Sequence, residues 1–155
     1  MTHYDIFNGD ADGLCALVQL RLAHPLDSNL VTGVKRDIQL LDRVNVAEDD
    51  HFTVLDISLD SNRADLQRIL AAGAQVEWFD HHYADPIPAH PGLNAHIVTA
   101  PDTCTSLIVD RHLSGAQRLW AIAGAFGDNL HQSAEQLATA AGLPIDKTKL
   151  LQELG

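Results

Sequence analysis

The stretch "HYDIFNGDADGLCALVQLRLAH" (residues 3–24) decides the fold. Its first six residues form a short, partly apolar run that predicts a strand. From Leu14 to Leu22 the apolar residues recur at helical spacing, and Pro25 follows the last of them. The junction between these two elements holds four polar or small residues, namely Asn8, Asp10, Asp12 and Gly13. The stretch therefore predicts a strand, a tight acidic turn and a helix.

The pattern of a strand followed by a helix continues along the chain. Short apolar runs predict further strands at residues 30–34, 51–57 and 74–80. A helix is expected over residues 61–73, because Ser61 and Asn62 suit its N-terminus and Gly73 suits its end. This alternation predicts an α/β fold built on a largely parallel sheet with helices on both faces.

The last third of the chain has a helical pattern throughout. Helices are expected over residues 103–113, 116–127, 133–142 and 145–154. With 155 residues, the chain is long enough for one domain with a hydrophobic core. We therefore expect a single domain over residues 1–155, with a helical C-terminal part packed onto the α/β part.

Composition restricts the function. The formal net charge of −11 disfavours binding to duplex DNA, which needs a basic surface, although acidic side chains that bind cations also contribute to such a charge. No apolar run approaches the roughly 20 residues of a membrane span, and the N-terminus lacks the features of a signal peptide. Two distant cysteines, Cys15 and Cys104, favour a reducing compartment and core positions. A cytoplasmic location is expected.

Acidic and histidine residues follow the predicted strands. Asp10 and Asp12 follow the first strand, Asp56 lies at the end of the third, and the triplet Asp80-His81-His82 ends the fourth. Ligands of open parallel sheets gather at the carboxyl ends of the strands. We therefore expect these side chains to converge there.

Each of these segments alone also has an ordinary structural interpretation. "NGDADG" matches half of a calcium-binding EF-hand loop, but Gln19 stands where that loop needs Glu, and the preceding residues predict a strand. The same acids can form a turn and cap the next helix. Adjacent histidines are often surface residues, and Asp128 after Gly127 can simply end a helix.

Taken together, the four segments "NGDADG", "VLDIS", "WFDHH" and "FGDN" resemble, in order, the motifs of the DHH phosphoesterase family. That family includes RecJ-type exonucleases, oligoribonucleases, cyclic-dinucleotide phosphodiesterases and family II inorganic pyrophosphatases. The resemblance covers nearly the whole chain. It implies two bound divalent ions, usually Mn²⁺, with Mg²⁺ and Co²⁺ as alternatives.

The resemblance also implies a role for each residue. Asp10 would bind the first ion, and Asp56 would bridge both. The second ion would be held by Asp12, His81 and Asp128. His82 would face the substrate phosphate, and Asp80 would orient a histidine ring.

Two positions depart from the family pattern. Many members carry a histidine four residues before the first Asp of the first motif, where this chain has Ile6. This departure disfavours the pyrophosphatase branch. Others carry an acid two residues before that Asp, where this chain has Asn8, a weaker possible additional ligand.

The sequence thus predicts a manganese-dependent phosphoesterase that hydrolyses a phosphodiester or phosphomonoester through a metal-activated water. A small phosphate ester or short oligonucleotide is the expected substrate, and a homodimer is possible. The family's usual second domain, with its "GGGH"-like segment, is not recognisable. The alternative is a non-catalytic metal- or nucleotide-binding regulatory domain of the same fold.

Several basic and aromatic residues are assigned to ordinary roles. Lys35 and Arg36 are expected to be a solvated pair beside Asp37 rather than substrate ligands. Trp78 and Trp120 are expected in the core.

Overall fold

A computed structural model describes all residues, 1–155, and contains one five-stranded sheet. The strands are β1 (His3–Asn8), β2 (Asn29–Gly33), β3 (His51–Leu55), β4 (Gln75–Asp80) and β5 (Leu93–Ile97). Their spatial order is β2-β1-β3-β4-β5, and every neighbouring pair is parallel. The predicted α/β class and parallel sheet are confirmed.

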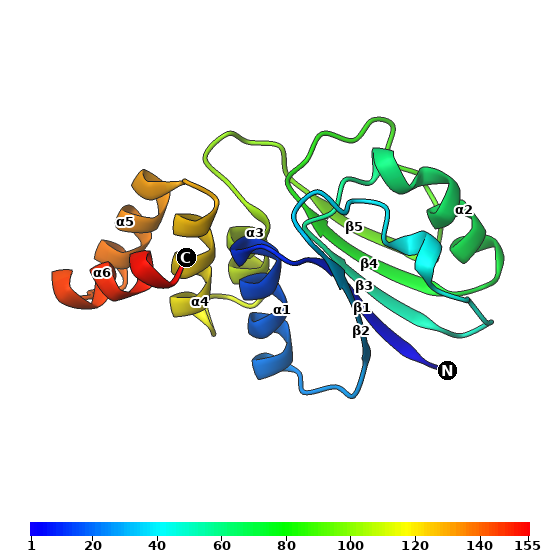
Figure 1. Ribbon diagram of the computed structural model, residues 1–155, viewed down its shortest axis with the longest axis horizontal. Coiled ribbons are helices and arrows are strands. Elements are labelled where there is room, and N and C mark those ends of the chain that lie inside the picture. Colours follow the sequence, from blue (N-terminus) through cyan, green and yellow to red (C-terminus); the bar gives the residue numbers. More distant parts are fainter.

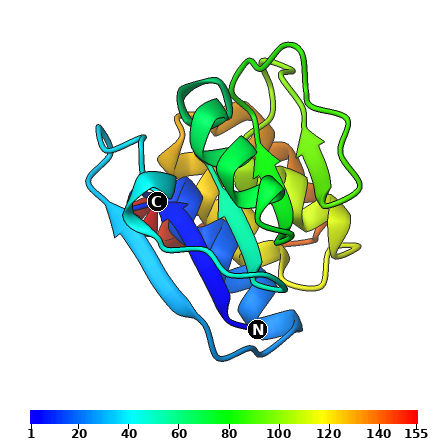
Figure 2. The same cartoon turned by 90° about the vertical axis from the view of Figure 1, so that its right-hand side faces the viewer.

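Six α-helices complete the fold. They are α1 (Ala11–Ala23), α2 (Arg63–Ala71), α3 (Thr105–His112), α4 (Arg118–Gly127), α5 (His131–Ala140) and α6 (Ile145–Leu154). Helix α2 covers one face of the sheet, and α1 and α3 cover the other, with α4, α5 and α6 lying beyond them (Figure 1). Viewed from the right-hand side of that picture, α2 lies in front of the strands (Figure 2). Helices therefore lie on both faces, as predicted.

Alternate side chains of the central strands build two separate cores. Ile6, Val54 and Trp78 point toward α2 and are completely buried there. Their neighbours Leu55 and Phe79 point the other way and pack against α1 and α3. A third apolar cluster joins α3, α4 and α5. Burial on both faces explains the consecutive apolar pairs Ile6-Phe7, Val54-Leu55 and Trp78-Phe79 in these strands.

The structure corrects four details of the sequence prediction. Strand β5 was not predicted, and its side chains are only partly buried because it lies at the edge of the sheet. Strand β3 ends at Leu55, since Asp56 adopts a positive φ of 59°. The side chain of Asn62 does not cap α2 but donates to the carbonyl oxygens of Ile38 and Ser58. Trp120 is only partly buried, whereas Trp78 is fully buried.

Both cysteines lie in the core, as predicted, and burial raises the pKa of the Cys15 thiol to about 12. None of the helices combines the length and apolar character needed to cross a membrane.

Candidate metal centre

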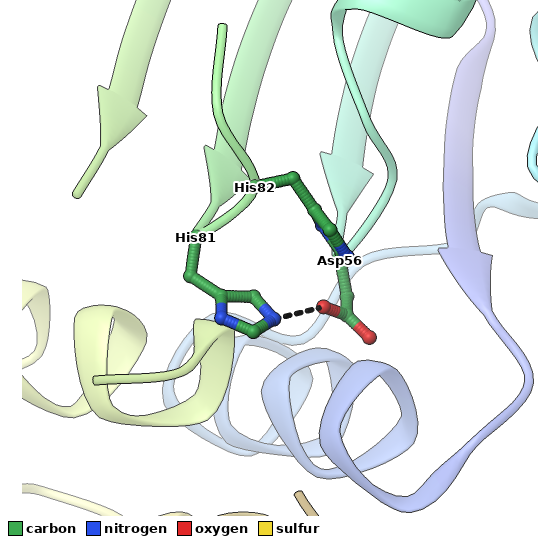
Figure 3. A group of neighbouring side chains, drawn as sticks. All are labelled: Asp56, His81 and His82. Atoms are coloured by element: carbon green, nitrogen blue, oxygen red, sulfur yellow. Dashed lines mark ion pairs between the residues drawn. The ribbon is translucent and has the colours of Figure 1, made fainter. Parts of the chain in front are cut away.

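Three neighbouring strands bring the predicted site residues to one edge of the sheet. Strands β1, β3 and β4 are adjacent and parallel, so their carboxyl ends lie side by side. Asp56 follows β3, and His81 and His82 follow β4 (Figure 3). Asp12 comes from the first turn of α1, and Asp128 comes from the C-terminal end of α4.

Asp12 is fixed by the N-terminus of α3. Its two carboxylate oxygens accept hydrogen bonds from the backbone N–H groups of Thr105 (2.8 Å) and Ser106 (2.7 Å). These are the first N–H groups of the helix, which have no partner within the helix and favour a negative charge. These two hydrogen bonds hold the buried Asp12 carboxylate in one orientation and compensate for its loss of contact with water. Each oxygen keeps a lone pair for a further ligand.

Asp56 and His81 form the centre of the site. His81 Nε2 lies 3.4 Å from Asp56 Oδ1, the pair joined by the dashed line in Figure 3. Burial, with Asp12 and Asp10 close by, raises the pKa of Asp56 to about 7. The hydrogen bond to Asp56 raises the pKa of His81 to about 9, against the opposing effect of burial. In the absence of metal, this pair therefore holds a proton near neutral pH.

Asp128 closes the site from the helical part of the chain. Its Oδ2 lies 3.8 Å from His81 Nε2. Burial and the neighbouring Asp12 raise the pKa of the Asp128 carboxyl. Asp12, His81 and Asp128 each offer one ligand atom, and these three atoms lie within 4.8 Å of one another. Residues from opposite ends of the chain are thus brought together by folding.

His82 lies beside the same centre and is oriented by Asp80. Its Nδ1 lies 2.6 Å from Oδ1 of the fully buried Asp80. This contact raises the pKa of His82. Asp56, His81 and His82 also bring one ligand atom each to within 4.8 Å of one another. His82 is the more exposed of the two rings, so it faces the solvent side of the site.

Asp10 lies at the border of the cluster and has two other partners. It caps α1 by accepting from the N–H of Gly13, and its Oδ2 lies 2.9 Å from Lys35 Nζ. Burial alone would raise the pKa of Asp10, but Lys35 and the Gly13 N–H outweigh it and lower the pKa. Asp10 thus caps α1 and lies close to Asp56, but it belongs to neither of the two ligand groups that folding forms here.

The two positions that depart from the family pattern have clear environments. Ile6 is completely buried in the core under α2. Asn8 is nearly buried, and its Oδ1 accepts the N–H of Asp10 (3.2 Å). Gly13 packs closely against the backbone of Asn8, where a Cβ would overlap the Asn8 carbonyl oxygen. Neither Ile6 nor Asn8 therefore adds an anionic ligand beside Asp10. The charged group next to this acid is the ammonium group of Lys35.

Three further residues contribute to the site beyond those predicted from the motifs. Thr105 and Ser106 hold Asp12, and the Thr105 hydroxyl donates to Asp56 Oδ1 (3.0 Å). Lys35 was expected in a solvated pair but contacts Asp10. The signal was present in both segments: Lys35 follows the end of a strand, and Thr105-Ser106 precedes an apolar run as helix starts do.

The donor set fits divalent cations. Four carboxylates converge with two imidazoles, and the pKa values of two of these acids are raised by burial and by their acidic neighbours. Carboxylates suit Mg²⁺ and Mn²⁺, and imidazole favours the transition metals. A bound cation would compensate for the charge repulsion that folding creates here.

Comparison with known proteins supports the fold. No protein-family model and no curated protein sequence matches the chain. A crystal structure of exonuclease RecJ bound to manganese aligns over 97% of this chain and 50% of its own, with 18% identity and a TM-score of 0.52. RecJ from Thermus thermophilus in complex with Mn²⁺ aligns over 97% of this chain and 28% of its own, with 18% identity and a TM-score of 0.51.

The chain thus spans half or less of the length of the RecJ chains to which it is similar. At this identity, the likeness concerns the fold alone. The chain has a RecJ-like α/β fold, in agreement with the fold that the DHH motifs implied.

Proposed function

We propose that this protein is a divalent-metal-dependent phosphoesterase of the DHH type. The observation that carries the proposal is the convergence of Asp12, His81 and Asp128, whose ligand atoms lie within 4.8 Å of one another. Asp56 lies next to this group, with its Oδ1 3.4 Å from His81 Nε2. The RecJ structures with which the chain shares its fold were determined with manganese, which supports the choice of Mn²⁺ as the metal to test.

Each ligand has a separate task in this proposal. Asp12, His81 and Asp128 would hold one ion, Asp10 would contribute to a second, and Asp56 would serve both. Divalent ions in such a site supply an activated water and neutralise the charge of a phosphoryl group. Two of these ligands are positioned before metal binds. Backbone N–H groups of α3 hold Asp12, and the Thr105 hydroxyl holds Asp56.

His82 is proposed to act on the substrate rather than on the metal. Asp80 holds its Nδ1, which leaves Nε2 free to point away from that contact. The hydrogen bond with Asp80 raises the pKa of His82, which favours the protonated form of the ring. It can therefore bind a phosphate oxygen and donate a proton to the leaving oxygen.

A nucleotide-type phosphodiester is the proposed substrate. The proposal draws on the exonuclease with which the chain shares its fold and on the small number of basic residues, 10 Lys and Arg against 21 Asp and Glu. Few basic groups favour a short substrate over a long duplex, because each contacted phosphate needs a compensating charge. We propose mononucleotide diesters and short oligonucleotides.

One observation favours a second candidate, a metal- or nucleotide-binding domain without turnover. Lys35 Nζ lies 2.9 Å from Asp10, and Ile6 and Asn8 supply no further anionic ligand to that side of the site. If the Asp10 side of the site binds its ion only weakly, the protein would bind metal or nucleotide with little catalytic activity.

Hydrolysis of bis(p-nitrophenyl) phosphate separates the two candidates. The phosphoesterase proposal predicts release of p-nitrophenol that requires Mn²⁺ and saturates with it. A His82→Gln variant should keep its affinity for Mn²⁺ and lose at least about tenfold in kcat. Tight manganese binding with no turnover of this ester or of a dinucleotide would favour the binding domain.

A further inference from the structure

A second group of metal-ligating side chains lies on the same sheet, away from the proposed active site. Glu77 from β4, His96 from β5 and His112 from the end of α3 each offer one ligand atom, all within 4.8 Å of one another. We refer to these three residues as the Glu77 cluster. They come from three elements and belong to none of the motifs that the proposed function uses.

The distances within the Glu77 cluster are close to those of a metal site. His96 Nε2 lies 3.2 Å from Glu77 Oε1. Two ligands at 2.0–2.1 Å from a tetrahedral zinc ion lie about 3.3 Å apart. The first pair therefore already has the required spacing. His112 is exposed at the last residue of its helix, so a small change of its side-chain torsions can bring the third ligand closer.

Aromatic packing orients both imidazole rings. Phe79 stacks on His96 with the ring centroids 4.4 Å apart and the planes at 9°. The same phenyl ring meets His112 edge to face at 5.0 Å and 78°. Because Phe79 is fully buried, it forms a fixed base for the two rings. The stacked His96 ring therefore loses little conformational freedom when it binds an ion, whereas His112 has to adjust its torsions.

A neighbouring pocket gives an ion access to the Glu77 cluster. Glu77 and His112 line a pocket of about 370 Å³ that also contains His3, His24 and His51. Three protein ligands would leave at least one coordination position for water. His112 also lies at the C-terminus of α3, where the helix dipole favours a positive charge.

We propose that Glu77, His96 and His112 bind a divalent transition-metal ion of the zinc class. Two imidazoles and one carboxylate suit Zn²⁺ better than Mg²⁺ or Mn²⁺, since nitrogen ligands follow the Irving–Williams order. The ion ties the edge strand β5 to the C-terminal end of α3. This site is independent of the proposed phosphoesterase activity, because it shares no residue with the Asp/His centre.

Calorimetric titration with Zn²⁺ tests this proposal on the full chain, with His81→Ala as the background that weakens the Asp/His centre. This background should bind zinc at the Glu77 cluster and give a thermal shift of about 5 °C at saturating metal. Adding His112→Ala, or Glu77→Gln as a second variant, should remove one zinc equivalent or weaken it at least about 100-fold. Co²⁺ in place of zinc should give the intense visible absorption of a low-coordinate site, lost in the same variants.

His24→Ala is the matched control, because His24 is an exposed histidine that lines the same pocket without belonging to the Glu77 cluster. It should leave the zinc affinity within about threefold of the background. The proposal is overturned if His112→Ala binds zinc as the background does, or if His24→Ala weakens binding as strongly as His112→Ala.

Discussion

Two regions of the sheet carry histidines and acids in different settings. At the carboxyl ends of the strands, Asp12 and Asp56 are buried with Asp10 and Asp128 nearby, and folding forces their like charges together. On strands β4 and β5, the Glu77 cluster has one acid and two histidines in a more open position, and both histidine rings pack on Phe79. At the first site, a bound cation would relieve the repulsion among the carboxylates. At the Glu77 cluster, packing on Phe79 places the ligands close together before an ion binds. Metal binding at the first site should therefore stabilise the fold by removing charge repulsion, an effect that is absent at the Glu77 cluster.

Loss of His81 is expected to have the largest effect of any single substitution. His81 lies 3.4 Å from Asp56 and 3.8 Å from Asp128, so it belongs to both ligand groups of the site. His81→Ala should lower kcat/KM for bis(p-nitrophenyl) phosphate with Mn²⁺ at least about 100-fold. His131→Ala, an exposed histidine on α5, is the control and should stay within about twofold of the unchanged protein. Equal activity of the two variants would contradict the assigned site.

The metal-free protein is expected to lose stability as the pH rises. The pKa of His81 is raised from 6.5 to about 9 in the folded state, so its contribution is complete below pH 6.5 and lost as the pH rises through about 9. Tm should fall by about 5 °C between pH 6.5 and 9.5 in a chelator, as measured by differential scanning calorimetry.

Saturating Mn²⁺ should remove most of this fall, because a bound ion replaces the proton on His81. The fall should be smaller in metal-free His81→Ala, where the raised pKa of Asp56 still contributes. If Tm falls by the same amount in His81→Ala as in the unchanged protein, titratable groups other than His81 cause the pH dependence.

Neutralising Asp128 should have opposite effects on stability and on metal binding. Burial and Asp12 raise the pKa of Asp128, so its charge is unfavourable in the metal-free fold. Asp128→Asn should raise the metal-free Tm by about 2 °C and weaken Mn²⁺ binding at least about tenfold. Glu77→Gln is the comparison at the other site, where no gain in the metal-free Tm is expected. A lower metal-free Tm for Asp128→Asn would contradict the repulsion argument.

Lys35 is expected to give the smallest effect. Its exposed ammonium lies 2.9 Å from Asp10 and competes with a cation at that carboxylate. Lys35→Gln should strengthen Mn²⁺ binding about threefold, with the screening of an exposed charge limiting the gain. Titration followed by electron paramagnetic resonance of free Mn²⁺ measures the change. Weaker binding would indicate that Lys35 supports the metal site rather than competing with it.

Much of the fold was predictable because the central strands are buried on both faces. Apolar runs such as residues 51–57 and acidic residues directly after them indicated the parallel sheet and the edge at which the site lies. The edge strand β5 was missed because "LNAHI" is short and only half-buried, so it lacks a strong apolar pattern. The left-handed conformation of Asp56, which ends β3, has no sequence signal of the glycine kind.

The identities of the site residues were more predictable than their partners. Ordered motifs indicated Asp12, Asp56, His81 and Asp128 before the structure brought them together. The contact between Lys35 and Asp10 depends on how β2 ends beside β1, which no local pattern encodes. Likewise, Thr105 meets Asp12 across 93 residues of sequence, through tertiary packing alone.

Anomalous diffraction from crystals soaked in Mn²⁺ tests the central claim most directly. The account predicts a manganese peak within bonding distance of Asp56 and His81, flanked by Asp12 or Asp128. A well-ordered site without any peak there, or manganese only at Glu77, His96 and His112, would contradict it.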